Sequence, residues 1–162
     1  MHRHKLPILH AEELPKLAPK EFAVLSTNAL EKLFPSVLNA VIAFGLATPI
    51  LVVYGPSLAW KVSVIVFFAL YESYVFLVRK DRCFGMKIMD TYWKKHYSLA
   101  QHLVYNILYT ASFATLFVYV WFPLDMFFIN VFLVQLPCVL FTETTLHGYL
   151  SGMTTVKIVP KT

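Results

Sequence analysis

The stretch RKDRCFGMKIMDTYWKKHYS, residues 79–98, is the most basic run of the sequence and holds six Lys/Arg residues. Long apolar segments lie directly before and after it. In a membrane protein with several spans, a short basic linker of this kind marks the cytoplasmic side and sets the direction in which the neighbouring segments cross. The sequence therefore predicts a small multi-pass membrane protein arranged around this linker.

The composition supports a membrane environment and argues against a soluble domain. Hydrophobic residues make up 58% of the chain, and charged residues make up 14%, against roughly 25% in soluble proteins. The mean hydropathy is +0.63. A net charge of +5 could indicate nucleic-acid binding, but the basic residues sit at the ends of apolar segments. The membrane accounts for them, and we expect no nucleic-acid partner.

Four apolar segments are long enough to cross a bilayer, which needs about 20 helical residues. We predict spans at residues 36–54, 57–78, 98–121 and 124–141. Turn signals separate the paired spans, Gly55-Pro56 in the first pair and Phe122-Pro123 in the second. An even number of spans places both termini on the same side of the membrane.

The distribution of positive charge tests that topology. Five Lys/Arg residues precede the first span, six lie in the linker and two in the tail, so thirteen of the fourteen fall on one side. Lys61 is the exception. By the positive-inside rule, we expect both termini in the cytoplasm of a bacterial inner membrane protein, or the equivalent side of an organelle membrane.

Outside the spans, the sequence predicts three further features. Residues 1–19 form an irregular basic tail, and residues 20–34 form an interfacial amphipathic helix with apolar positions at helical spacing. Two β-prone runs, residues 86–91 and 154–159, are expected to pair as a small cytoplasmic ribbon. The predicted fold class is therefore an all-α four-span membrane domain, residues 35–160, with this ribbon beneath it.

Short motifs in the linker and tail are similar to those of a known family. The linker carries GMKIMD at 85–90 and Ser98-Leu99, and the tail carries TLHG at 145–148 and LSG at 150–152. Over roughly residues 30–160 the chain resembles the RDD family of small polytopic bacterial membrane proteins. The resemblance implies ion transport or an accessory role, and it rests on these motif positions: Lys32, Gly85, Lys87, Asp90, His147 and Gly152.

The chain departs from that family at its signature charges. The family's arginine before the first span falls at Lys32, its next aspartate at Asn39, and its late aspartate at Gly148. The resemblance therefore implies a divergent member.

Polar side chains within the predicted spans gather in the cytoplasmic half. Glu72 is an acidic residue deep in the second span, and an intramembrane acid is a functional candidate by default. The predicted cluster consists of Glu72, Asn106, His102, Gln135 and Asn39. It either forms a proton or cation site that is open to the cytoplasm, or it holds the helices together through hydrogen bonds.

Two functions follow from these features. The first is a structural or partner-binding accessory subunit of a larger membrane complex, in contact with lipids and with other membrane subunits. The alternative is a small ion- or proton-coupled transporter that uses Glu72. No glycine-rich phosphate loop or nucleophile turn occurs, and His2, His4 and His10 lack further ligands at metal-binding spacing. We therefore expect neither an enzyme nor a metal or other cofactor.

Overall fold

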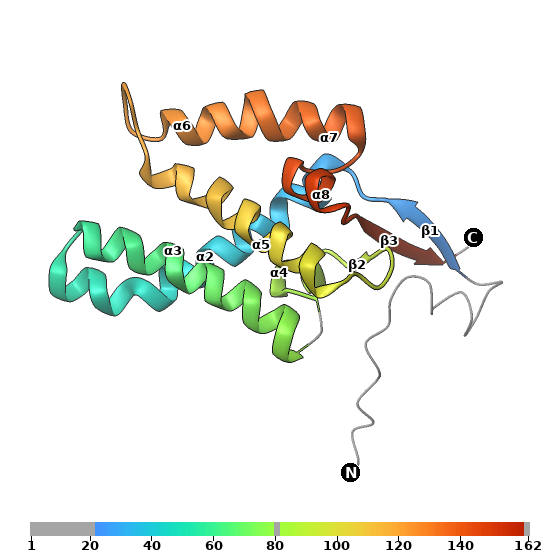
Figure 1. Ribbon diagram of the computed structural model, residues 1–162, viewed down its shortest axis with the longest axis horizontal. Coiled ribbons are helices and arrows are strands. Elements are labelled where there is room, and N and C mark those ends of the chain that lie inside the picture. Colours follow the sequence, from blue (N-terminus) through green and yellow to red (C-terminus); the bar gives the residue numbers. More distant parts are fainter. Residues whose placement is uncertain (1–21, 80–81, 161–162) are drawn as a thin grey trace, which may run out of the picture.

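The structure is a computed structural model that describes residues 22–79 and 82–160. It is mainly helical, with a small sheet at one end of the helices (Figure 1). The two long helices are α2 (Ala29–Tyr54) and α3 (Leu58–Tyr74). The remaining elements are β1 (Phe22–Ser26), η1 (Val75–Arg79), α4 (Phe84–Ile88), β2 (Thr91–Trp93), α5 (Leu99–Ala114), η2 (Thr115–Phe117), α6 (Asp125–Phe128), η3 (Ile129–Gln135), α7 (Leu136–Thr142), α8 (Leu146–Ser151) and β3 (Thr155–Pro160).

Helices α2 and α3 form an antiparallel hairpin that carries the core. Gly55, with φ of 64°, ends α2, and the Ser57 side chain caps α3. Small side chains on α2, including Ala43 and Ala47, are fully buried and let α3 approach closely. Phe68 of α3 fills the space beside them and stacks on Phe113 of α5 with ring centroids 4.0 Å apart. Close contact between small and large side chains is the usual way in which helices pack in lipid.

Three helical stretches of the described chain are long and apolar enough to cross a membrane: Ala29–Tyr54, Leu58–Leu77 and Asp125–Thr142. The predicted span at 98–121 is the exception. Helix α5 has 16 residues, and a 3₁₀ turn follows it up to Phe117. At 1.5 Å per residue, α5 alone reaches about 24 Å and falls short of a bilayer core of about 30 Å.

The interfacial helix predicted over residues 20–34 is wrong for the described part of that range. Residues 22–26 form strand β1, and α2 begins at Ala29 and continues through Pro35. The start of α2 is fixed by a reciprocal cap, in which the side chains of Asn28 and Glu31 each bond the other residue's backbone N–H. Helical spacing suggested the wrong element because the partner of β1 is 130 residues away in sequence, in β3.

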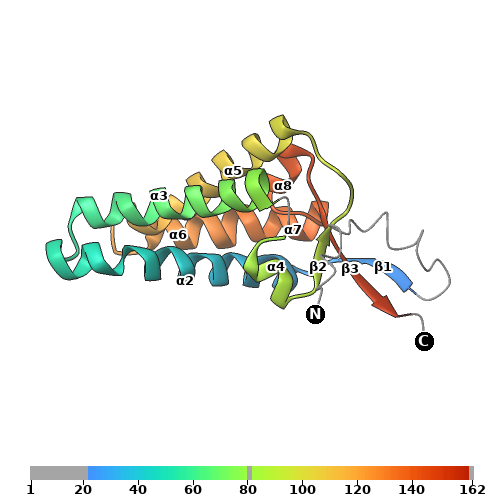
Figure 2. The same ribbon diagram turned by 90° about the horizontal axis from the view of Figure 1, so that it is seen from below.

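The sheet has three antiparallel strands in the order β1-β3-β2, where a ribbon of two strands was predicted. The tail run does form a strand, β3, but the linker run is shifted. Residues 84–88 are helix α4, and the strand begins at Thr91, which pairs with Lys157. A third strand makes the unit more stable than an isolated two-stranded ribbon. Both ends of the described chain lie in this sheet, beyond one end of the helices (Figure 2).

Candidate functional site

A polar cavity of about 40 Å³ lies where α2, α3, α4, α8 and the sheet meet. Its lining includes Lys32, Asn39, Glu72, Cys83 and His147. A cavity needs only 10–15 Å³ to hold one water molecule, so this one has room for about three. It is the place where the polar residues of the spans meet the linker and the tail.

Glu72 and Asn39 form the centre of this site. Their side chains are 2% and 1% exposed. Asn39 Nδ2 donates to Glu72 Oε1 at 2.7 Å and to Cys83 Sγ at 3.2 Å. The Gly85 backbone N–H donates to Asn39 Oδ1 at 3.2 Å. One amide on α2 therefore links the acid on α3 with the backbone of α4.

Gly85 is required by the close approach of α4 to α2. A β-carbon at this position would lie 2.5 Å from the Pro35 carbonyl oxygen and 2.8 Å from its carbonyl carbon. The Phe84 backbone N–H donates to the Tyr71 hydroxyl at 2.9 Å, which ties the start of α4 to α3 as well. The short helix α4 thus closes the cavity on the side of the linker.

Cys83 closes another side of the cavity. Burial, together with the nearby Glu72 charge, raises the pKa of the Cys83 thiol to about 12. A thiol with such a pKa stays protonated and unreactive at neutral pH, so Cys83 contributes packing and a weak hydrogen bond.

His147 closes the cavity from the tail side. Its ring stacks on Tyr109 with centroids 4.7 Å apart and meets the ring of Tyr105 edge-on at 4.8 Å. Its Nε2 atom is 2.9 Å from Thr145 Oγ1, while its buried Nδ1 atom has no hydrogen-bond partner among the described residues. Burial lowers the pKa of His147 to about 3. The imidazole is therefore neutral at physiological pH.

This shift predicts acid sensitivity. The unfolded chain protonates His147 below about pH 6.5, whereas the folded chain resists protonation until about pH 3, so the folded state loses stability as the pH falls through that window. We expect a loss on the order of 1 kcal/mol per pH unit, and a shallower dependence in His147→Gln. Thermal unfolding in detergent measures this. The same dependence of unfolding temperature on pH in wild type and His147→Gln would contradict this prediction. His96→Gln, at an exposed position of the linker, is the control and should behave as wild type.

The other residues of the predicted polar cluster lie apart from the cavity centre. Asn106 Nδ2 donates to Ser73 Oγ at 2.6 Å, and Gln135 Nε2 donates to Ser112 Oγ at 3.3 Å. The ring of His102 packs on Phe76, with centroids 4.3 Å apart. Within the predicted cluster, a hydrogen bond joins Asn39 and Glu72.

The family-motif positions divide into two groups. Lys32, Gly85 and His147 adjoin the cavity, and the Lys32 ammonium donates to the carbonyl oxygens of Thr27, at 2.5 Å, and Glu143. Three further positions do not line the cavity. Lys87 is exposed on α4, and Gly152 ends α8 with φ of 69°. Asp90 has φ of 54°, and its Oδ1 atom lies 3.7 Å from Arg82 Nη1.

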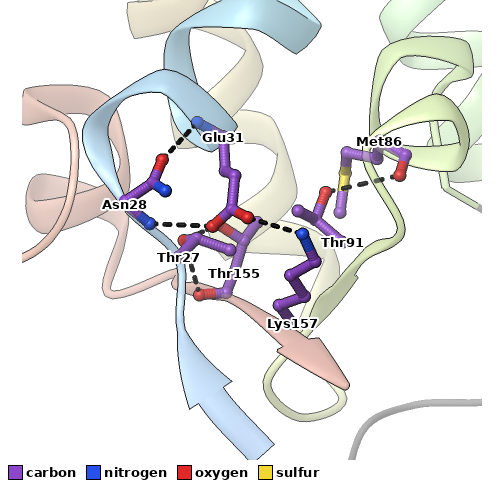
Figure 3. Close-up of polar contacts among 7 residues, drawn as sticks. All are labelled: Thr27, Asn28, Glu31, Met86, Thr91, Thr155 and Lys157. Atoms are coloured by element: carbon purple, nitrogen blue, oxygen red, sulfur yellow. Dashed lines mark hydrogen bonds and ion pairs between the residues drawn. The ribbon is translucent and has the colours of Figure 1, made fainter. Parts of the chain in front are cut away.

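A polar junction between the sheet and α2 was missed by sequence reasoning (Figure 3). Lys157 Nζ of β3 lies 2.7 Å from Glu31 Oε1, and Thr27 Oγ1 donates to the Thr155 carbonyl oxygen at 3.1 Å. On the other side, Thr91 Oγ1 donates to the Met86 carbonyl oxygen at 3.4 Å. The Lys157–Glu31 and Thr27–Thr155 contacts join residues more than 120 positions apart, which no local pattern indicates.

Three helical stretches of the described chain that are long and apolar enough to cross a bilayer indicate a helical membrane protein. Comparison of the chain with protein-family models, with curated proteins and with solved structures gave no match.

Proposed function

We propose that this protein is an accessory subunit of a larger membrane complex and that it binds a transmembrane helix of a partner. The observation that carries this proposal is a groove of about 420 Å³ between α2, α5 and the helical run α6–η3. Its walls are mainly apolar and include Val37, Phe113, Leu116, Phe127 and Val131.

Hydrogen bonds hold in place the wall of this groove that η3 forms. Asn130 Nδ2 donates to Ser112 Oγ at 2.7 Å, and Gln135 Oε1 accepts from the Leu146 backbone N–H at 3.0 Å. The wall is therefore held in place, and side chains of the described residues leave the space beside it unfilled. Helices associate in lipid through close van der Waals packing, and large side chains of a partner helix would gain such contacts in this groove.

The groove also adjoins the polar cavity. Ser36, Tyr109 and His147 line both. A helix in the groove would therefore lie against the polar centre of the subunit, which gives the buried polar residues a structural role in holding the docking surface.

Filling the groove tests the proposal. Val131→Trp places a bulky ring in the groove, and we expect at least about tenfold less partner to co-purify in mild detergent. Val52→Trp, at a position 79% exposed on α2, is the matched control and should leave recovery unchanged. Recovery of the wild type as a homo-oligomer with no stoichiometric partner would count against the subunit role.

A second candidate is a small ion- or proton-coupled transporter that uses Glu72. One observation favours it: the Glu72 carboxylate accepts a hydrogen bond from Asn39 through Oε1 and borders the cavity that has room for water. At the end of the helices opposite the sheet, the structure gives little support for a continuous path for ions or protons. Asp125 accepts backbone N–H groups from Val120, Trp121, Phe122 and Met126, so its carboxylate is engaged in holding a turn.

We further propose that the chain is a divergent RDD member that crosses the membrane four times, with α5 and η2 as the third crossing. Lys32 and Asn39, at two of the altered family positions, both line the polar cavity. At the third, a β-carbon on Gly148 would lie 2.8 Å from the Met153 carbonyl oxygen, so an aspartate does not fit without movement.

The orientation that we propose puts the sheet and both termini in the cytoplasm, in a bacterial inner membrane or an organelle equivalent. Lys61 lies at the opposite end of the helices, with its ammonium 5.9 Å from the centroid of the Tyr119 ring. The other described basic side chains, Lys32, Arg82, Lys87, Lys94, Lys95 and Lys157, belong to the sheet end, as the positive-inside rule requires of a cytoplasmic face.

A further inference from the structure

A second groove, of about 460 Å³, lies on the α2–α3 hairpin next to the linker. Its apolar part is formed by Ile42 of α2 and Val75 of η1, with Tyr74 and Phe84 about half exposed beside them. Arg82 and Lys87 line the same groove. An apolar trough and two cations therefore share one surface.

The groove runs from within the apolar span to just beyond its end. The span of α3 ends at Leu77, and the two cations follow it in the chain, whereas Tyr71 lies six residues before that end. At 1.5 Å per residue, the groove therefore extends about 9 Å into the span. The phosphate layer of a bilayer lies at the level where an apolar span ends and basic residues begin.

Arg82 is held in a defined position at the head of the groove. Its guanidinium lies 3.9 Å from the centroid of the Tyr92 ring, and its Nη1 atom is 3.7 Å from Asp90 Oδ1. Nη1 also donates to the Thr91 carbonyl oxygen at 3.3 Å. A guanidinium carries five N–H donors in a planar fork that matches phosphate oxygens, and an ordered one binds phosphate at a smaller entropic cost.

We propose that this groove binds an anionic phospholipid from the leaflet on the sheet side. The phosphate lies between Arg82 and Lys87, and the upper part of an acyl chain follows Tyr74, Val75 and Ile42. A phospholipid supplies both an anion and a long apolar chain, in the order and at the depth at which this groove presents cations and apolar side chains. This site is independent of the partner groove, since the two share no lining residue.

Lipid retention by the purified full chain tests the site. We expect the protein in mixed detergent micelles to bind phosphatidylglycerol roughly 25-fold more tightly than phosphatidylcholine, because each basic residue near an anionic headgroup contributes about a fivefold preference. The double variant Arg82→Gln/Lys87→Gln should lose nearly all of that preference. Lys94→Gln/Lys95→Gln removes the same charge from the same linker outside the groove, and should retain most of it.

A second variant tests lipid binding without changing Arg82, whose loss could disturb the fold of the linker. Lys87→Glu reverses an exposed charge on α4 and leaves the contacts of Arg82 intact, and it should lower the preference by about tenfold or more. Equal binding of the two lipids by wild type would overturn the proposal. So would an equal loss in the Lys94/Lys95 variant, or displacement of the lipid by glycerol phosphate at matched concentration, which would indicate a site for the free anion.

Discussion

Gly85→Ala is expected to prevent normal folding of the sheet end, with a loss of stability above about 3 kcal/mol or no accumulation in the membrane. The added β-carbon would press on the backbone of Pro35, 2.5 Å from its carbonyl oxygen, and a backbone clash cannot be relieved by turning a side chain. The same displacement would pull the Gly85 N–H away from Asn39 and open the cavity around Glu72.

Gly45→Ala is the matched control, because both glycines lie in helices and nothing is within 4 Å of a β-carbon at Gly45. Alanine favours helix over glycine by about 1 kcal/mol, so this variant should be as stable as wild type or slightly more stable. Membrane abundance and thermal unfolding in detergent measure both variants. Indistinguishable unfolding of Gly85→Ala and wild type would refute the close packing of α4 on α2.

Glu72→Leu is expected to destabilise the protein by about 1–3 kcal/mol, whereas Glu72→Gln should leave it nearly unchanged. Glutamine keeps the shape of the side chain and an oxygen that accepts the bond from Asn39 Nδ2, now 2.7 Å from Glu72 Oε1. Leucine removes that acceptor, so that among the described residues the buried Asn39 Nδ2 keeps only its weak bond to Cys83 Sγ. Thermal unfolding of the two variants in detergent measures the difference.

The same pair of variants separates the two candidate functions. If the protein is a subunit, Glu72→Gln should recover its partner at the wild-type level and Glu72→Leu should recover less. If it is a transporter, Glu72→Gln removes the titratable group, so coupled flux in proteoliposomes should disappear while the protein stays folded. A pH-dependent cation flux in wild type that is absent from well-folded Glu72→Gln would refute the structural role that we propose for Glu72.

The sequence was sufficient to predict the long apolar helices and the turn at Gly55, because hydrophobic length and turn residues are local signals. It was insufficient for the sheet. Strand β1 depends on pairing with β3, at the other end of the chain, and residues 84–88 form a helix because Gly85 can pack against Pro35. Such contacts override local propensity and leave no periodic pattern to be read.

For the site residues, position along a span was easier to predict than the face of the helix on which a residue lies. Residue counting placed Asn39 and Glu72 in the same cytoplasmic half of the spans, and their side chains are hydrogen-bonded. The same counting grouped them with Asn106 and Gln135, which bond Ser73 and Ser112 elsewhere in the bundle. Which face a helix turns to each neighbour is set by packing, and the sequence alone does not specify it.

The π-helical segment η3 has a consequence for how this chain should be aligned with any other. On an α-helix, residues five apart point about 140° away from each other. In η3, Gln135 Nε2 reaches Asn130 Oδ1 at 3.4 Å, and both side chains bond Ser112. Such a turn accommodates one extra residue within an otherwise α-helical run. A homologue with a plain α-helix here would therefore match this chain only across a one-residue gap between positions 130 and 135, and an ungapped alignment would pair every later residue of α7 with the wrong face.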